Sequence, residues 1–176
     1  MTYLALCFFL LTNIAFAEVG NISKVSSKSG SYIIRGKDKK SLTSNLKLEE
    51  GDQIFSQRGN VTLKLSNLAQ ISLKKDTVIK VNQPSQITFV KGLVIVNNQK
   101  SDFKVDADGV MFVDQGSHYA VSKVKENFEL DVMKGEVIVS SPFVQTFVPE
   151  VVKANEGFRF DKKAHTFERR KYKARK

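Results

Sequence analysis

Alternation of apolar and polar residues between Leu48 and Val81 constrains the fold of this chain more than any other feature. In residues 61–66, Val61, Leu63 and Leu65 alternate with Thr62, Lys64 and Ser66. This two-residue period predicts a β-strand with one buried face and one solvated face. The period returns in residues 71–73 and 79–81, and an acidic glycine turn precedes it at residues 48–54. The segment supplies no convergent nucleophile, base or metal set, so we expect function to reside in surfaces rather than in a pocket.

The rest of the chain follows the same pattern. Short runs of β-branched and aromatic residues are separated by Gly, Asn, Asp and Lys, a combination typical of strands and turns. The runs fall at residues 61–65, 71–73, 78–81, 87–90, 93–96, 103–105, 110–113, 118–121, 128–132 and 137–139. We therefore predict an all-β fold with a single β domain at residues 18–161.

An internal repeat at a spacing of 43 residues indicates how the strands are arranged. Residues 87–96, ITFVKGLVIV, align with residues 130–139, LDVMKGEVIV. Similar units that cover one another's apolar faces predict stacked short strands in a β-solenoid-like fold. A two-sheet β-sandwich gives a similar strand spacing and stays open as the alternative.

The first seventeen residues carry no charge and end in Ala15-Phe16-Ala17, a small-x-small cleavage pattern before Glu18. We expect a signal peptide at residues 1–17 and an exported protein of the periplasm or cell envelope. An uncleaved anchor and a mis-assigned start codon stay open, although a membrane span needs about 20 apolar residues. Cys7 is the only cysteine, so we expect no disulfide in the mature chain. We also expect the mature chain to have no transmembrane helix.

The positive charge of the chain is concentrated at its C-terminal end. Residues 162–176 hold eight Lys or Arg residues and one Glu, and we treat them as a basic C-terminal tail. Its cations are candidates for binding an anionic surface such as lipid head groups or lipopolysaccharide, whereas export argues against nucleic acid. The alternative is a solvated, partly disordered tail. The candidate cations are Lys162, Lys163, Arg169, Arg170, Lys171, Lys173, Arg175 and Lys176.

Catalytic and metal-binding patterns are weak throughout. The carboxylates of Glu49, Glu50 and Asp52 fit a turn better than an acid–base pair. His118 and His165 are the only histidines, which leaves no clustered histidine metal site. The chain has no Gly-x-Ser-x-Gly elbow and no glycine-rich phosphate loop. We expect no catalytic residues, no metal and no cofactor, and thus no enzyme.

Taken in order along the chain, the motifs resemble the FecR domain, an extracytoplasmic module named after regulators of ferric citrate uptake. The resemblance covers roughly residues 19–160 and implies an all-β, solenoid-like stack of short strands. Its landmarks here are structural residues, with Gly51 and Asp52 as turn-formers. They are Gly51 and Asp52 in the Leu-x-x-Gly-Asp-x-Ile pattern, Gly92 in Lys-Gly-x-Val-x-Val, Gly116 before Ser117, Gly135 in the closing strand pair, and Gly157.

FecR-type regulators also carry a cytoplasmic anti-sigma segment, a transmembrane helix and a second small signalling domain. The sequence shows none of these, so we expect a freestanding, non-catalytic, exported FecR-like module for binding or scaffolding in the bacterial cell envelope. Its partner would be an envelope protein, a glycan or an anionic lipid surface. The alternatives are an accessory in envelope signalling linked to iron or metal uptake and, more remotely, an envelope hydrolase. The oligomeric state stays open.

Overall fold

The computed structural model describes residues 18–26, 30–141 and 148–172; the predicted signal peptide lies outside this range. Every regular element described is a strand, which confirms the all-β prediction. Sheet A has the order β18-β17-β14-β13-β10-β7-β6-β1-β4, and sheet B has the order β16-β15-β12-β11-β9-β8-β5-β2-β3. Two facing sheets are thus observed, which matches the sandwich alternative.

The strand bounds follow the turn residues of the sequence. Sheet A contains β1 (Glu18–Val25), β4 (Lys47–Glu49), β6 (Val61–Leu65), β7 (Gln70–Leu73), β10 (Leu93–Asn97), β13 (His118–Val124), β14 (Asn127–Lys134), β17 (Glu156–Asp161) and β18 (Thr166–Lys171). Sheet B contains β2 (Tyr32–Arg35), β3 (Asp38–Ser41), β5 (Gln53–Ser56), β8 (Thr77–Gln83), β9 (Gln86–Lys91), β11 (Ser101–Ala107), β12 (Val110–Gln115), β15 (Glu136–Ser140) and β16 (Glu150–Lys153).

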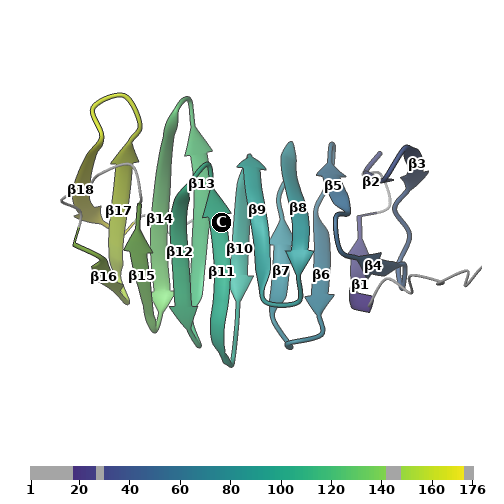
Figure 1. Cartoon of the computed structure of the whole chain (residues 1–176), viewed down its shortest axis with the longest axis horizontal. Coiled ribbons are helices and arrows are strands. Elements are labelled where there is room, and N and C mark those ends of the chain that lie inside the picture. Colours follow the sequence, from purple (N-terminus) through teal and green to yellow (C-terminus); the bar gives the residue numbers. More distant parts are fainter. Residues whose placement is uncertain (1–17, 27–29, 142–147, 173–176) are drawn as a thin grey trace, which may run out of the picture.

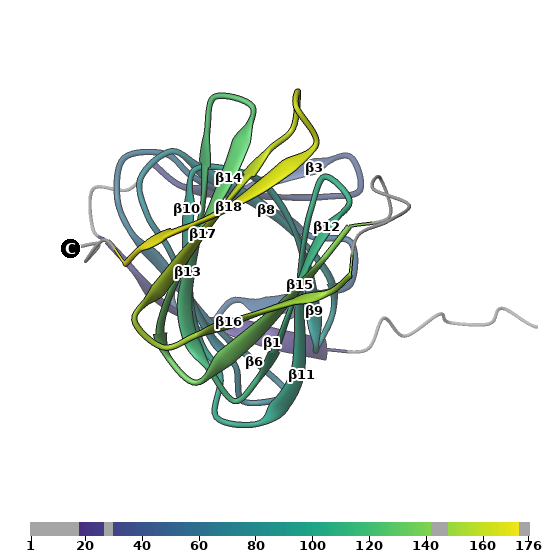
Figure 2. The same cartoon turned by 90° about the vertical axis from the view of Figure 1, so that its left-hand side faces the viewer.

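The chain advances along the long axis of the molecule while it switches between the sheets (Figure 1). It places β1 in sheet A, β2 and β3 in sheet B, and continues in this manner to β17 and β18 in sheet A. The view along the long axis shows the two sheets facing each other (Figure 2). Strands β9 and β11 pair in parallel, whereas β8–β9 and β11–β12 are antiparallel.

Alternate residues of each strand fill the space between the sheets. In β6, Val61 and Leu63 have no exposed surface and Leu65 is 2% exposed, while Lys64 on the opposite face is exposed. The alternation therefore predicts the buried face correctly. The largest core side chains are aromatic and come from both sheets, and they include Phe89, Phe103, Phe112, Tyr119, Phe128, Phe158 and Phe160.

The 43-residue repeat corresponds to a structural device that carries the chain from one sheet to the other. Gly92 (φ +97°) connects β9 in sheet B to β10 in sheet A, and Gly135 (φ +79°) connects β14 in sheet A to β15 in sheet B. A buried hydroxyl closes each crossing. Thr77 Oγ1 donates to Leu93 O at 3.1 Å and accepts from Leu93 N at 3.0 Å.

Ser117 performs the same task at the second crossing. Its Oγ donates to Glu136 O at 2.6 Å and accepts from Glu136 N at 3.1 Å. A Cβ atom on Gly92 would lie 2.5 Å from Thr77 Oγ1, and one on Gly135 would lie 2.7 Å from Ser117 Oγ. Both glycines are therefore required by close approach as well as by backbone conformation.

The C-terminal segment differs from the predicted tail. Residues 166–171 form β18, which pairs with β17 at the end of sheet A. The Phe167 ring packs against Phe158 and Phe160, with ring centroids 5.2 and 4.7 Å apart. The many cations of this segment suggested a tail, although residues 166–171 form a strand in which Phe167 packs against the core. No helix in the described part of the chain could cross a membrane.

Candidate functional site

The outer face of sheet A carries aligned rows of polar side chains. Strand register places Lys24 beside Thr62 and Thr62 beside Ser72 across β1, β6 and β7. A second row on the same face contains Lys64, Gln70 and Asn97 from β6, β7 and β10. The inward neighbours Leu63 and Ile71 are fully buried, so core packing fixes the outward direction of both rows.

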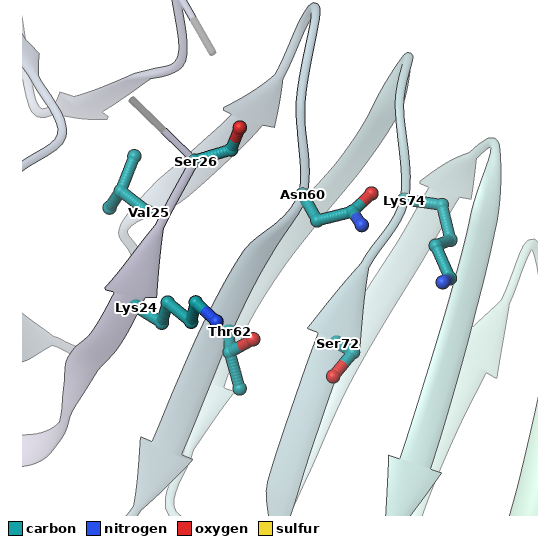
Figure 3. A pocket seen from close by; sticks show the side chains of 7 residues that line it. All are labelled: Lys24, Val25, Ser26, Asn60, Thr62, Ser72 and Lys74. Carbon is teal, nitrogen blue, oxygen red and sulfur yellow. The ribbon is translucent and has the colours of Figure 1, made fainter. Parts of the chain in front are cut away.

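A first hollow of ≈ 470 Å³ lies over the first row. Lys24 extends along the face toward Thr62, while Ser72 and Lys74 come from β7 and the residue that follows it (Figure 3). The β-bulge in β1 between Ile22 and Lys24 helps to shape this edge of the hollow. Its lining residues are Lys24, Val25, Ser26, Asn60, Thr62, Ser72 and Lys74.

A second hollow of ≈ 330 Å³ lies over the second row, one pair of residues further along β6 and β7. It is lined by Ser23, Lys64, Leu68, Gln70, Asn97 and Gln99. Leu68 stands out in this set, because its side chain is 49% exposed and its φ is +74°. We call the residues that line the two hollows the polar strip.

The polar strip has a positive electrostatic character. Lys24, Lys64 and Lys74 belong to it, and none of its residues carries a carboxylate. Within the part of the chain that the structure describes, none of these three lysines has an ion-pair partner within 4.0 Å. Their charges are available to an anionic ligand, and the hydroxyls and amides around them can donate or accept hydrogen bonds.

The functional groups of the strip are ammonium groups, hydroxyls and amides, and its lining residues include no His, Cys, Asp or Glu. Among residues 18–26, 30–141 and 148–172, no group of three His, Cys, Asp or Glu side chains is arranged to hold a metal ion.

Several cations of the predicted basic tail lie within ion pairs instead of on a free surface. Arg169 contacts Glu150 at 2.6 Å and Glu156 at 3.0 Å. Lys162 pairs with Asp108, and this contact lowers the pKa of Asp108. Lys163 and Lys171 are exposed. Lys173, Arg175 and Lys176 lie outside the described residues.

Arg170 is the most deeply placed of these cations. It lies on the outer face of sheet A, crosses above Gly157 and reaches the carboxylate of Asp131 at 2.8 Å. Asp131 has no exposed surface, and the Arg170 side chain is 13% exposed. A Cβ atom on Gly157 would lie 2.9 Å from Arg170 Cγ. Gly157 therefore gives the arginine room to cross, which is the structural reason for glycine at this landmark.

The acidic glycine turn has a comparable ion pair. Gly51 adopts φ +91° and forms the turn, whereas Asp52 is fully buried and accepts two hydrogen bonds of 2.8 Å from Arg35. Arg35 also contacts Glu49 at 2.6 Å. The bond to Asp52 raises the pKa of Arg35. Asp52 is thus more than a turn-former, because it holds β2 and the β4–β5 turn together.

The remaining glycine landmark lies beside a polar cluster inside the core. Asp114 Oδ1 accepts from Asn98 Nδ2 at 2.8 Å and from the backbone N of Gly116 at 3.0 Å. Gly116 itself has φ +85°. Burial raises the pKa of Asp114, and burial together with the charge of Asp114 raises the pKa of Tyr119. Asp114 Oδ2 and Tyr119 Oη are buried and have no hydrogen-bond partner among the described residues.

The sequence identified only part of the polar strip. The outward direction of Thr62 and Lys64 follows from the alternation. Their neighbours Lys24, Ser72 and Gln70 come from other strands, and only the register brings them together. The signal available in the sequence was that each run of alternating residues contains polar residues, which must face outward.

Comparison with known proteins identifies the fold. No protein-family model and no curated protein matches the chain. Two crystal structures of a protein from Parabacteroides distasonis, described as a "putative anti-sigma factor", are similar in structure, with TM-scores of 0.58 and 0.57. Sequence identity is 15% in both cases, over 68% of this chain and 59% of that chain. The chain thus aligns with less than two thirds of its structural neighbour, and the likeness establishes the fold alone.

Proposed function

We propose that this protein is an exported, non-catalytic FecR-like binding module of the bacterial cell envelope, and that the polar strip on sheet A is its contact surface. The observation that carries the proposal is the continuity of the strip. Two adjoining hollows on one rigid face present lysines, hydroxyls and amides without a carboxylate. The order of the FecR-like motifs and the fold shared with the Parabacteroides protein support the family assignment.

Binding to envelope material tests this proposal. Purified protein is mixed with the insoluble envelope fraction of a Gram-negative bacterium, and the bound fraction is measured by sedimentation. The double variant Lys24→Gln/Lys74→Gln removes two cations from the first hollow. The matched control, Lys80→Gln/Lys104→Gln, removes two exposed cations from the strands β8 and β11 of sheet B.

We expect the wild type and the control to sediment with the envelope and the strip variant to stay largely in the supernatant. Equal sedimentation of all three proteins, or no sedimentation of the wild type, would contradict the proposal. A panel of peptidoglycan and activity-probe assays covers the hydrolase alternative, because turnover in any of them would show that the module is catalytic.

A role in envelope signalling is the second candidate, favoured by the fold that the chain shares with a protein described as an anti-sigma factor. In this role the bound envelope ligand would modulate a regulator of iron or metal uptake. A deletion strain should then show altered iron-dependent gene expression. Unchanged expression under iron limitation and iron repletion would exclude this role.

A further inference from the structure

We infer that the polar strip binds an acidic polysaccharide, and that Leu68 contacts the sugar rings. This inference deepens the proposed function and rests on it, since it names the ligand class of the same surface. Its evidence comes from the second hollow, where strain, exposure and hydrogen-bonding capacity coincide.

Leu68 occupies a backbone conformation that its side chain disfavours. Positive φ is uncommon for residues other than glycine and is a clear outlier for a bulky side chain, whereas asparagine and aspartate tolerate it. The turn holds this conformation with hydrogen bonds from Leu68 N to Leu65 O and from Leu65 N to Ala69 O, both 2.9 Å. Backbone strain of this type concentrates at functional sites.

The strained residue is also an exposed apolar residue on a polar face. The Leu68 side chain lies at the hollow lined by Lys64, Gln70 and Asn97 and is 49% exposed. A ligand with an apolar surface next to many hydroxyls would use both kinds of group, and a sugar ring has this character because its C–H bonds lie inside a rim of hydroxyls.

The polar residues of the second hollow fit such a ligand. The amides of Gln70, Asn97 and Gln99 make no side-chain hydrogen bond to another described residue. Each amide has two N–H donors and one carbonyl acceptor, which suits adjacent hydroxyls on a sugar. Ser23 Oγ donates to Thr62 O at 3.1 Å, and its lone pairs stay available to a ligand.

Charge and shape extend the inference from a sugar to an acidic chain. Lys64 lies in the second hollow and Lys24 and Lys74 in the first, so cations occur along the length of the strip. Carboxylate or phosphate groups spaced along a polymer would meet them in turn. The strip has no aromatic residue, which disfavours nucleic acid, since single strands are bound by stacking on aromatic side chains.

The substitution Leu68→Asn separates binding from stability. Asparagine tolerates positive φ, so the variant should be at least as stable as the wild type. Relief of the backbone strain should raise its melting temperature by about 2–4 °C. The same change removes the apolar contact. We expect the affinity for polygalacturonate, measured by isothermal titration calorimetry, to fall by about five- to tenfold.

Further arms identify the ligand class. Lys64→Gln should weaken binding to polygalacturonate, and Lys80→Gln/Lys104→Gln should leave it unchanged. Dextran, a neutral polysaccharide, should bind weakly or not at all. Phosphatidylglycerol vesicles should bind no better to the wild type than to Leu68→Asn.

The inference is wrong if Leu68→Asn binds polygalacturonate as tightly as the wild type, if dextran binds equally well, or if vesicles bind through the strip and polygalacturonate does not. Failure here is distinguishable from failure of the proposed function. Envelope sedimentation that depends on Lys24 and Lys74, together with no binding of polygalacturonate, would retain the binding module and reject the acidic polysaccharide.

Discussion

The crossing between β9 and β10 should lose more stability than an open turn when its glycine is replaced by alanine. Gly92 at the crossing and Gly51 in the turn have similar backbone conformations but different surroundings. Gly92 has φ +97° and Gly51 has φ +91°. A Cβ atom on Gly92 would lie 2.5 Å from Thr77 Oγ1 and 2.6 Å from Thr77 Cα, whereas a Cβ atom on Gly51 would meet nothing within 4 Å. Comparing Gly92→Ala with Gly51→Ala therefore separates steric conflict from conformational strain.

Conformational strain at positive φ should cost each variant about 1–2 kcal/mol. Gly92→Ala has a further cost, because a backbone atom of Thr77 must move and the two hydrogen bonds that its hydroxyl shares with Leu93 are disturbed. At about 1 kcal/mol net for each bond, Gly92→Ala should lose about 2 kcal/mol more than Gly51→Ala.

Urea denaturation followed by circular dichroism at 218 nm or by intrinsic tyrosine fluorescence measures the free energy of unfolding of each variant. Thr77→Val supplies a second comparison, since it removes the hydroxyl and leaves glycine in place; it should lose about 1–2 kcal/mol. If Gly92→Ala and Gly51→Ala are destabilised equally, close packing against Thr77 is not what requires glycine at the crossing.

The buried ion pair, the buried acid and the exposed lysines of β17 and β18 can each be tested by substitution. Arg170→Met leaves the fully buried Asp131 without its guanidinium and should cost about 3–5 kcal/mol; Arg169→Met, whose side chain is 52% exposed, should cost less than about 1 kcal/mol in the same urea titration, and equal losses would contradict the assignment. Because burial raises the pKa of Asp114, its contribution to stability is present at acid pH and is lost as pH rises through the folded-state pKa. The melting temperature of Asp114→Asn should therefore rise relative to that of the wild type as pH increases above 3.8, the ordinary pKa of an aspartate, and a difference that does not change with pH would count against this. If anionic vesicles bind the hairpin formed by β17 and β18, Lys163→Gln/Lys171→Gln should weaken the salt-sensitive association more than Lys80→Gln/Lys104→Gln does, and an equal effect of the two double variants would place the contact outside this hairpin.

Local patterns predicted the strands because each residue of a strand faces either the core or the solvent, and its polarity indicates which. Val61, Leu63 and Leu65 were assigned to the core from their spacing and are buried. Glycine turns likewise marked the crossings at Gly92 and Gly135. The order of the strands in each sheet could not be predicted from these patterns. The parallel pairing of β9 with β11, for example, depends on contacts between separate segments, which a local alternation of residues does not reveal.

The same limit explains the site. The sequence shows that Thr62 and Lys64 face outward, but their meeting with Lys24, Ser72 and Gln70 depends on register between strands. At the C-terminus, the eight cations of residues 162–176 favoured a solvated tail, whereas residues 166–171 form a strand. Phe167 was the one residue whose type indicated that strand. Only the structure shows that Arg170 pairs with a buried acid two strands away.

The two crossings at Gly92 and Gly135 have a consequence for how a chain of this type can grow. The first leads from sheet B to sheet A and the second from sheet A to sheet B, so the 43-residue period spans an odd number of passages between the sheets. Duplicating one such unit would transfer every later strand to the opposite side of the molecule and invert the side on which its polar residues appear. Duplicating two would restore them. Gene duplication by this unit would therefore preserve a one-sided binding surface only in even steps.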